Sequence, residues 1–425
     1  MLKEFSIKNY KSINEEVTFS MEADVDRVSE NPSHIIHLRD NALLRVGSMY
    51  GPNGGGKSNI LKAIYLLRSI ITNGPLFDAS DDCSCAFSDD PLCEFVVFFA
   101  TDKFDIGYKI RFSIVWNSDF DEEGPIRPAP HFEAAIDSES VHVFDDAAGE
   151  YKEICERNAK GEITANDSII SKLIYDKAIG QSTSILRFFY QFFYNEEVDS
   201  PMPLEIIFDL YKEISSFVML RDDLPRNYPR PLSSFYAESV LEHKEELIRM
   251  LDAADIRIKN IVVEKGDPRS RIFFVRDFDS GNGIIEKSID LSEESSGTQK
   301  LFDMLLMFLR RKRRDTVLLG DDINAYLHPK LLAAILDLFN SGRMGNSQLI
   351  FNSHDIVNMN NRVFRRDEIW FVYRDEKYQT NIIPLSNITN YKGKQIRNDA
   401  SYGKQYLEGK YGADPFIQKG LNWDE

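Results

Sequence analysis

The stretch Gly51-Pro-Asn-Gly-Gly-Gly-Lys-Ser58 fits the spacing G-x-x-x-x-G-K-[ST]. A strand-like apolar run, Leu44 to Tyr50, precedes it, and apolar residues follow at helical spacing, at Ile60, Ile64, Leu67 and Ile71. Glycines allow consecutive backbone N–H groups to point at phosphate oxygens, and the start of the helix adds partial positive charge. The stretch therefore predicts a phosphate-binding loop between a strand and a helix.

The composition of this loop predicts a site for ATP with Mg²⁺. We expect the Lys57 ammonium to reach the β- and γ-phosphates and the Ser58 hydroxyl to ligate Mg²⁺. A glycine-rich turn without a nucleotide is the alternative, and the order strand, loop, helix argues against it. The residues predicted to hold the nucleotide here are Asn53, Gly54, Gly55, Gly56, Lys57, Ser58 and Asn59.

A second apolar run, Thr316 to Leu319, leads through a glycine to Asp321 and Asp322. If this run is a neighbouring strand, its acidic end lies beside the phosphates, where Asp321 is expected to hold Mg²⁺ through water. The same acidic pair also suits an ordinary strand-end turn. Its position after the phosphate loop favours the metal role.

A third apolar run, Gln348 to Phe351, is followed by Asn352, Ser353 and His354. Ligands of open α/β sheets bind at the carboxyl ends of the strands, so His354 is expected at the same edge as the phosphate loop. A lone histidine would carry little information. The order of the three motifs makes this histidine a candidate site residue.

Strand-like runs alternate with helical patterns in the carboxy-terminal part, which predicts a parallel α/β core that also includes Glu368 to Tyr373. Earlier in the chain, Glu94 to Ala100 and Tyr108 to Ile114 indicate two antiparallel strands of a small accessory sheet. The predicted fold class is therefore α/β, a P-loop NTPase head with a mixed sheet, a small antiparallel sheet and a helical insertion.

We divide the chain into three parts. Residues 1–150 are expected to form the amino-terminal half of the head, with the phosphate loop and the accessory strands. Residues 151–255 are rich in helix-like apolar stretches and are interpreted as the helical insertion, and residues 256–425 as the carboxy-terminal half. The aromatic residues within 188–194 indicate either buried helix packing or a surface for a partner.

The chain has 425 residues and a formal net charge of -17, which argues against a protein that grips nucleic acid over its whole surface. The run Arg310 to Arg314 is either a local basic patch or a helix end whose cations complement the helix dipole. Cys83, Cys85 and Cys93 indicate either a zinc site or three unrelated thiols, and a structural zinc site usually takes four ligands.

No apolar run reaches the roughly 18 residues that indicate a membrane span. The longest run, Leu301 to Leu309, is broken by Asp303. The amino-terminal residues lack the basic, apolar and small-residue regions of a secretory signal. We therefore expect a cytoplasmic protein without a membrane partner.

The stretch Leu291-Ser-Glu-Glu-Ser-Ser-Gly-Thr-Gln-Lys300 is a polar turn that opens a helix. It is either a simple helix cap or the signature turn of the ABC ATPases, which it resembles at Ser296, Gly297 and Gln299. In that family the turn contacts the γ-phosphate bound by a second protomer. The resemblance implies that these three residues bind ATP across a homodimer or a higher homo-oligomer.

Further motifs extend the resemblance to a narrower group. They are Leu327-His-Pro329, Asn352-Ser-His-Asp355, Arg365-Arg-Asp-Glu-Ile-Trp370 and Gly409-Lys-Tyr-Gly-Ala-Asp-Pro415. With the signature turn they look like the bacterial abortive-infection ATPases of the AbiLi, RloA and AriA kind, relatives of the SMC, RecF and OLD ATPases. The resemblance implies an ABC-type head with a helical lobe, a role in antiphage defence, and a separate toxic effector such as a nuclease.

Three departures from the family pattern concern catalysis. Relatives usually carry Asp-Glu where this chain has Asp321-Asp322, so the resemblance implies that Asp322 is the water-activating acid, one methylene shorter, with His354 beside it. Asn324 stands where relatives commonly have Asp. No convincing Q-loop glutamine follows Ser58 before the helical region. We expect ATP hydrolysis to be slow.

Three other functions compete with this interpretation. A DNA-maintenance ATPase of the RecF or SMC kind would bind DNA through a dimeric head, which the acidic balance disfavours. A transporter ATPase subunit is disfavoured by the helical insertion and the missing Q-loop. A self-contained nuclease of the OLD kind would need a further domain, for which too few residues follow His354.

Overall fold

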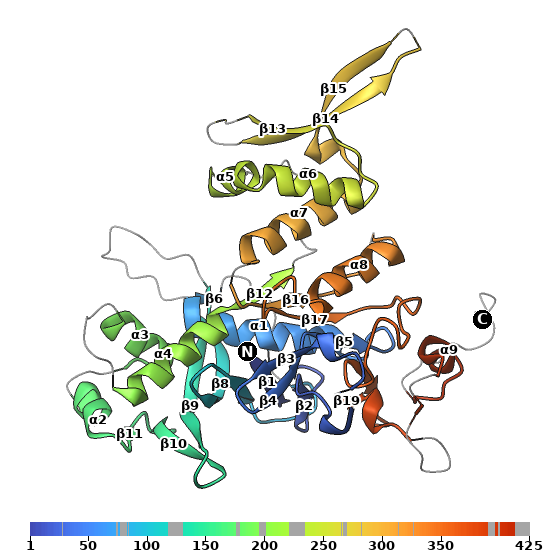
Figure 1. The fold of residues 1–425 in the computed structure, drawn as a ribbon. Helices are drawn as coiled ribbons and strands as arrows, with labels where there is room; N and C mark the ends of the chain where they lie inside the picture. Colours follow the sequence, from blue (N-terminus) through green and yellow to red (C-terminus); the bar gives the residue numbers. More distant parts are fainter. Residues whose placement is uncertain are drawn as a thin grey trace, which may run out of the picture.

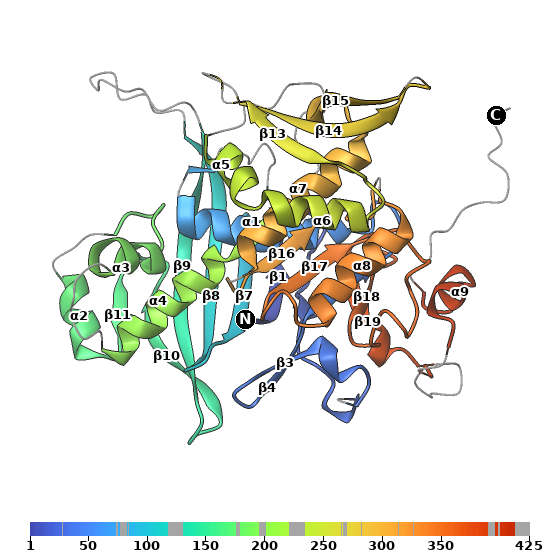
Figure 2. The ribbon, with the colours of Figure 1, turned by 45° about the horizontal axis from the view of Figure 1, so that its top comes forward.

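The computed structural model shows an α/β fold built around two large sheets (Figures 1 and 2). Arg313 of the predicted basic run and residues 413–415 of the last motif lie outside the described residues. The structure describes residues 1–27, 29–73, 75–76, 83, 85–117, 131–175, 179–194, 201–220, 234–264, 266, 270–281, 283–312, 314–325, 327–389, 396–397 and 400–412.

A six-stranded sheet has the order β12-β16-β17-β5-β18-β19. Neighbouring strands are parallel except for β19, which is antiparallel to β18. The strands are β5 (Val46–Tyr50), β12 (Phe217–Leu220), β16 (Val317–Gly320), β17 (Gln348–Asn352), β18 (Ile369–Arg374) and β19 (Thr380–Pro384). The predicted parallel core is confirmed, and its central strands are buried along their whole length, as a sheet covered on both faces requires.

A second, eight-stranded sheet is antiparallel and has the order β11-β10-β9-β8-β7-β1-β2, with β6 paired to β9. The predicted strand pair is confirmed as β7 and β8, but the sheet is much larger than the small accessory sheet that was expected. Its strands are β1 (Leu2–Lys8), β2 (Val17–Ser20), β6 (Pro75–Leu76), β7 (Cys93–Ala100), β8 (Asp105–Asn117), β9 (His131–Asp145), β10 (Glu150–Arg157) and β11 (Ile163–Ala165).

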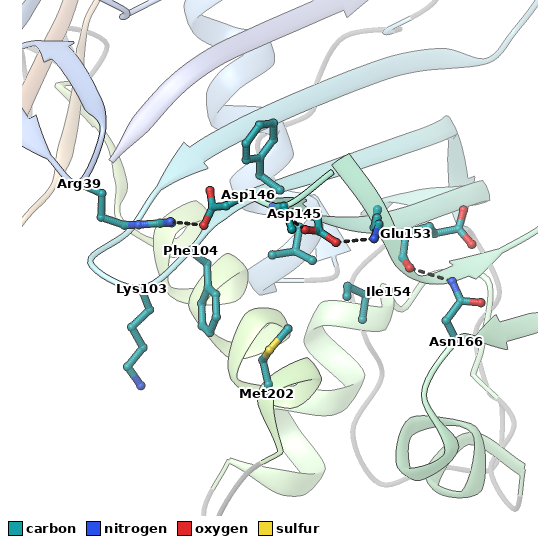
Figure 3. A pocket seen from close by; sticks show the side chains of 13 residues that line it. Arg39, Lys103, Phe104, Asp145, Asp146, Glu153, Ile154, Asn166 and Met202 are labelled. Carbon is teal, nitrogen blue, oxygen red and sulfur yellow. Dashed lines mark hydrogen bonds and ion pairs between the residues drawn. The ribbon is translucent and has the colours of Figure 1, made fainter. Parts of the chain in front are cut away.

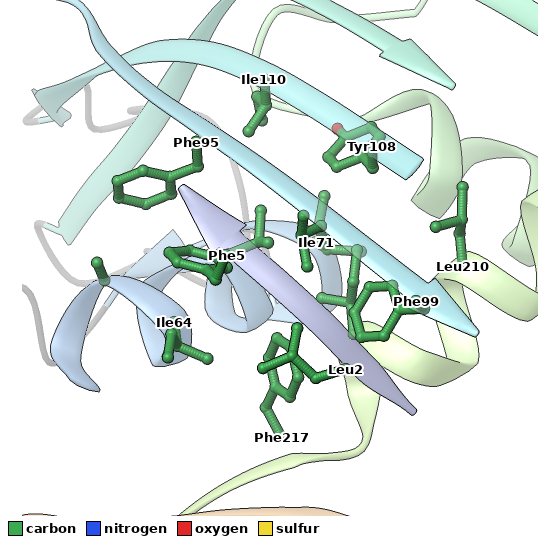
Figure 4. Close-up of a cluster of buried hydrophobic side chains, with 14 of the residues drawn as sticks. Leu2, Phe5, Ile64, Ile71, Phe95, Phe99, Tyr108, Ile110, Leu210 and Phe217 are labelled. Carbon is green, nitrogen blue, oxygen red and sulfur yellow. The ribbon is translucent and has the colours of Figure 1, made fainter. Parts of the chain in front are cut away.

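Helix α1 (Lys57–Asn73) packs between the two sheets, and its buried side chains join those of both in one core (Figure 4). Ile64 and Ile71 of α1 lie near Phe5 and Phe95 of the antiparallel sheet. The two sheets also approach each other directly, because a side chain at Gly47 on β5 would meet Phe19 Cζ and Met21 Sδ at 2.7 Å.

The opposite face of the parallel sheet is covered by α7 (Ser296–Arg311) and α8 (Pro329–Asn340). Along β16, Val317 and Leu319 belong to the α1 core and Leu318 to the α7 and α8 core, the alternation of a strand buried on both faces. A three-stranded antiparallel sheet lies beyond α7 (Figures 1 and 2) and consists of β13 (Asn260–Glu264), β14 (Arg271–Asp279) and β15 (Ile284–Asp290).

The range 151–255, which was predicted to be helical, also contains β11, most of β10, and β12 of the parallel sheet. The strand β10 is rich in charged residues, and its sequence lacks the clear alternation that marks a half-buried strand. The helices of this range are α2 (Ser168–Tyr175), α3 (Ile185–Phe193), α4 (Met202–Ser215), α5 (Ser234–Glu242) and α6 (Lys244–Ala253). The remaining elements are the hairpin β3 (Ile35–Leu38) and β4 (Asn41–Leu44), α9 (Tyr402–Leu407) and the 3-10 turns Val25–Arg27, Pro32–His34, Leu291–Glu293 and Leu385–Asn387.

A buried polar network fixes the start of α3 to the antiparallel sheet. The Glu139 carboxylate forms an ion pair with Arg157 and accepts hydrogen bonds from the Tyr108 hydroxyl and, at 3.0 Å, from the Ile185 amide. Burial raises the pKa of Glu139, and the Arg157 charge acts in the opposite direction. The network satisfies a fully buried carboxylate, which would otherwise be strongly destabilising.

The aromatic cluster is divided between core and surface. Phe188 and Phe189 are buried, whereas Phe192 is 54% exposed and Tyr194 is 42% exposed. The buried pair confirms helix packing for those two residues, and a partner surface at the exposed pair stays a prediction. All four cysteines, Cys83, Cys85, Cys93 and Cys155, are buried. No helix in the described part of the chain is long and apolar enough to cross a membrane.

Two motifs that carried the resemblance have structural roles. His328 is the N-cap of α8, and its Nδ1 accepts a hydrogen bond from the Lys330 amide at 3.2 Å. In the motif before β18, the buried Glu368 carboxylate lies 2.9 Å from His34 Nδ1, and burial raises the pKa of Glu368. The buried Asp367 carboxylate accepts a hydrogen bond from the Asp24 amide at 2.8 Å. This motif fixes the amino-terminal segment against the parallel sheet.

Candidate nucleotide-binding site

The loop between β5 and α1 has the backbone shape of a phosphate-binding loop. Gly51 has φ 154° and Gly56 has φ 107°, in the region that side chains disfavour. A Cβ at Gly51 would overlap the Val372 carbonyl oxygen, and a Cβ at Gly56 would overlap the Thr380 hydroxyl. Glycine is therefore required at these two positions of the motif by both conformation and space.

Lys57 is the first residue of α1 and is only 6% exposed. Its Nζ donates hydrogen bonds to the carbonyl oxygens of Gly51 at 2.8 Å and Pro52 at 2.9 Å. Burial lowers the pKa of Lys57, and the carboxylates of Asp322 and Asp321 act in the opposite direction. The ammonium is thus held over the loop, next to the position where phosphates bind in such loops.

The two residues predicted to hold the metal lie together. The Ser58 hydroxyl donates a hydrogen bond to Asp321 Oδ1 at 2.8 Å. The buried Asn352 amide donates to the same Asp321 oxygen and, at 3.4 Å, to Ser58 Oγ. Asn352 is not among the predicted site residues, although it is the last residue of β17 and directly precedes the serine and histidine of the predicted motif.

Ser58 and Asp321 could hold Mg²⁺ only if a bound nucleotide supplied further ligands. In the described part of the chain, no cluster of three or more His, Cys, Asp or Glu side chains could hold a metal ion. Protein Mg²⁺ sites often combine one or two carboxylates with phosphate oxygens and water. Ser58 and Asp321 supply a hydroxyl and one carboxylate, the protein share of such a site.

Asp322 and His354 lie next to each other beside these ligands. His354 Nε2 is 3.8 Å from Asp322 Oδ1, and both side chains are about half exposed. Asp322 has φ 44°, a left-handed conformation, in which its amide donates to Asn352 Oδ1 and its carbonyl accepts from Lys300 Nζ at 3.1 Å. Burial and the nearby Lys57 charge lower the pKa of His354, and Asp322 acts in the opposite direction.

Asn324 holds the segment that carries the histidine. Its Oδ1 accepts a hydrogen bond from the Ser353 hydroxyl at 2.9 Å and from the His354 amide at 3.3 Å. The sequence marked Asn324 only as a departure from the family pattern. The structure shows that its side-chain oxygen, which Asp would also provide, joins the end of β16 to the end of β17.

A hydrogen-bond network that includes Thr380 of β19, the edge strand of the sheet, supports the phosphate loop. The Thr380 hydroxyl donates to the Gly55 carbonyl at 2.9 Å and lies 2.8 Å from the Ser12 hydroxyl. The Asn59 amide donates to the same Ser12 oxygen at 2.8 Å. Asn59 is also one of the residues predicted to hold the nucleotide, and that role stays a prediction. Neither Ser12 nor Thr380 belongs to a pattern that the sequence reveals.

The predicted signature turn is held by side chains around it. Ser295 caps α7 by accepting a hydrogen bond from the Thr298 amide at 3.1 Å, so Ser296 and Gly297 form the first turn of the helix. Gln299 Nε2 donates to the Glu294 carbonyl at 2.7 Å, and its amide therefore supports the turn. The Glu294 carboxylate pairs with Arg276 of β14 at 2.6 Å. Ser296 itself is exposed.

A separate groove of about 820 Å³ lies around the β9–β10 turn (Figure 3). Its charged residues pair with each other, as Arg39 does with Asp146 at 2.9 Å and Lys152 does with Asp145. Phe104 and Met202 form part of its apolar lining. None of the predicted nucleotide-site residues lines this groove, so it provides no support for the nucleotide site.

The fold and the arrangement at the ends of β5, β16 and β17 define an α/β fold of the P-loop NTPase type. Phosphate loop, acidic strand end and histidine strand end come from adjacent parallel strands and meet at one edge. This class matches the fold class predicted from the sequence.

The model of a family described as "AAA domain, putative AbiEii toxin, Type IV TA system" matches residues 208–360. No curated protein matches the sequence.

Among solved structures, the chain is similar to the SMC head domain from Thermotoga maritima, with 13% identity, 90% of this chain and 98% of that chain covered, and a TM-score of 0.39. It is similar to the SmcHead bound to the C-winged helix domain of ScpA, with 14% identity, 90% and 96% covered, and a TM-score of 0.45. A third is the Smc head domain with an extended coiled coil bound to the C-terminal domain of ScpA, derived from Pyrococcus furiosus, with 14% identity, 90% and 95% covered, and a TM-score of 0.40.

Proposed function

We propose that this chain binds ATP with Mg²⁺ at the phosphate loop and hydrolyses it slowly. The observation that carries the proposal is the contact of Ser58 with Asp321, which brings a phosphate-loop hydroxyl and a strand-end carboxylate to one point. Lys57 would exchange its loop carbonyls for the β- and γ-phosphates. Mg²⁺ held by Ser58 and, through water, by Asp321 would neutralise charge that develops on the phosphates.

Asp322 is the candidate base for the attacking water, and His354 is placed to contact the γ-phosphate or that water. The left-handed backbone of Asp322 turns its exposed carboxylate toward His354. An Asp carboxylate is shorter than that of Glu by one carbon–carbon bond, about 1.5 Å. A displacement near 1 Å in a positioned reaction costs on the order of 100-fold. Slow turnover would keep the ATP-bound state populated.

We further propose that two heads associate through their ATP sites. Ser296 is exposed at the start of α7, where the helix amino terminus favours an anion, and neighbouring hydrogen bonds fix the turn. A turn of this kind would contact the γ-phosphate held by the second protomer. The ATP-bound form would then be a homodimer or a higher homo-oligomer with nucleotide at the interface.

The biological role that we propose is control of a separate toxic effector in antiphage defence. The resemblance to abortive-infection ATPases supports this role, as does the family model over residues 208–360, which include the signature turn, Asp321 and His354. Toxicity would belong to the effector, because the catalytic groups that we assign serve the ATP site. A localisation in the cytoplasm and the absence of a membrane partner are part of this proposal.

The decisive experiment measures nucleotide binding and association with the same protein. Purified wild type is expected to bind ATP in the presence of Mg²⁺ and to double in mass by light scattering, whereas Lys57→Ala should do neither. Ser296→Arg should bind ATP and stay monomeric. An unchanged Lys57→Ala protein would refute the nucleotide site. Salt-sensitive, ATP-dependent binding of duplex DNA would favour the DNA-maintenance alternative instead.

A further inference from the structure

Arginines from two helices meet at the edge of the parallel sheet opposite the phosphate loop. Helix α7 ends in Arg310 and Arg311, and Arg314 follows just before β16. Arg68 lies near the end of α1, and its Nε donates to the Ser215 carbonyl at 3.4 Å. Helix α1 begins at the phosphate loop and α7 begins at the predicted signature turn, so these arginines lie toward the opposite ends of the two helices.

The strand register brings the two sets of arginines to the same place. Ser215 ends α4 just before β12, whose first residue, Phe217, is paired in parallel with Val317. Val317 comes three residues after Arg314. Arg68 and Arg314 therefore lie at the amino-terminal ends of two adjacent strands. We call Arg68, Arg310, Arg311 and Arg314 the arginine cluster.

Positive charge in this cluster is concentrated. The charged neighbours that act on Arg311 are Arg310, Arg314 and Arg68, all of the same sign, and together with burial they lower its pKa. Within the described ranges, the side chains of Arg311 and Arg314 have no hydrogen bond or ion pair. Lys312 differs, because its Nζ is 3.7 Å from the Glu246 carboxylate.

A helix end explains only part of this arrangement. The dipole of α7 favours cations in its last turn, which accounts for Arg310 and Arg311. It does not account for Arg68, which comes from another helix, or for Arg314, which lies beyond the end of α7. Crowded like charges destabilise a fold unless an anion lies among them. Asp315 is the acidic residue next to Arg314, and a further anion would reduce the remaining repulsion.

We propose that the arginine cluster is a docking site for a short acidic segment of a partner protein. Guanidinium groups bind carboxylates in a planar, two-point manner, and they lose less hydration than lysine ammonium groups do. The cluster is compact, whereas nucleic acid affinity is built from many phosphate contacts along a basic surface. The strongly acidic balance of the chain repels a long polyanion more than a short one.

The test uses the full-length protein and a labelled peptide of ten glutamates as the probe. By fluorescence anisotropy at low salt, wild type is expected to bind the peptide, and added salt should weaken binding because exposed charges are screened. Arg314→Gln, a change at an exposed side chain, should lower affinity about threefold to tenfold, and Arg311→Gln with Arg314→Gln by about tenfold or more. The matched control is Arg257→Gln, which removes one charge from a side chain that is 85% exposed elsewhere.

Thermal unfolding gives a second readout that does not depend on the fluorescent label. Because Arg314→Gln removes like-charge repulsion, its melting temperature without peptide should equal or exceed that of wild type, and the peptide should raise the melting temperature of wild type more than that of the variant. Equal peptide binding by wild type and both variants would overturn the proposal. Tighter arginine-dependent binding of duplex DNA of equal charge would also overturn it, in favour of a nucleic-acid site.

Discussion

The Ser58 hydroxyl lies 2.8 Å from the Asp321 carboxylate, although 263 positions of sequence separate the two residues. The contact joins the first turn of α1 to the end of β16, across β17, whose Asn352 amide donates to both partners. Three adjacent elements thus converge on one oxygen.

Ser58→Ala and Asp321→Asn should weaken ATP binding by about tenfold in the presence of Mg²⁺, since a hydrogen bond or metal contact to a charged group is worth about 1.5–3 kcal/mol. Without Mg²⁺, affinity should change little, because the phosphates still meet Lys57 and the loop amides. Titration of a fluorescent ATP analogue with Mg²⁺ or with a chelator checks this. Equal losses under both conditions would show that the residues shape the loop rather than hold the metal.

Asp322→Asn should lower ATP turnover by about 100-fold or more while ATP affinity is preserved, because the carboxylate acts on the water and not on the nucleotide. Asp322→Glu should raise turnover, since the longer side chain restores the usual reach toward the γ-phosphate. Single-turnover kinetics with a stoichiometric amount of ATP measure the step directly. Normal hydrolysis by the Asn variant would assign the base to another group.

His354 should titrate below its ordinary pKa of about 6.5. Asp322→Asn should move the midpoint further down, because it removes the neighbouring negative charge, and Lys57→Met should move it up. Between the lowered pKa of the native state and the ordinary pKa of the unfolded chain, the unfolded chain binds more protons. The titration of His354 therefore lowers the stability of the fold as pH falls through about 6.5. Histidine NMR titration of the protein without nucleotide is the measurement. A midpoint above 6.5 would contradict it.

Asn324→Ala should slow turnover by about tenfold, because the Ser353 hydroxyl and the His354 amide lose their common acceptor. Asn324→Asp keeps an acceptor oxygen and should retain most of the activity. ATP affinity serves as the control and should be equal in both variants. If the Asp variant is as slow as the Ala variant, the oxygen of Asn324 is not what positions the histidine.

Arg157→Met should destabilise the fold by about 3–5 kcal/mol at neutral pH, because it leaves the Glu139 carboxylate buried without its cation. The cost should shrink as pH falls, since Glu139 can then take up a proton. Lys152→Met, which removes an exposed partner of Asp145, should cost far less, because solvent screens an exposed pair. Urea unfolding at two pH values measures both. Equal costs for the two variants would refute the role of the buried pair.

Sequence motifs predicted those parts of the site whose functional residues are consecutive in the chain. The glycine loop, the acidic strand end and the histidine strand end could be predicted because each follows an apolar strand, and parallel strands align their carboxyl ends. Thr380 and Ser12 could not be predicted, since each is an ordinary hydroxyl that acquires its role only when distant segments pack together. The strands at β10 and β11 were missed because their burial is set by neighbouring strands, not by their own alternation.

At Gly47 there is no room for a methyl group between β5 and the neighbouring Phe19 and Met21. A larger side chain at position 47 would therefore have to displace Phe19 or Met21, and β5 leads directly into the phosphate loop. The packing of the antiparallel sheet thus bears on the strand that carries the phosphate loop, although neither Phe19 nor Met21 belongs to the nucleotide site.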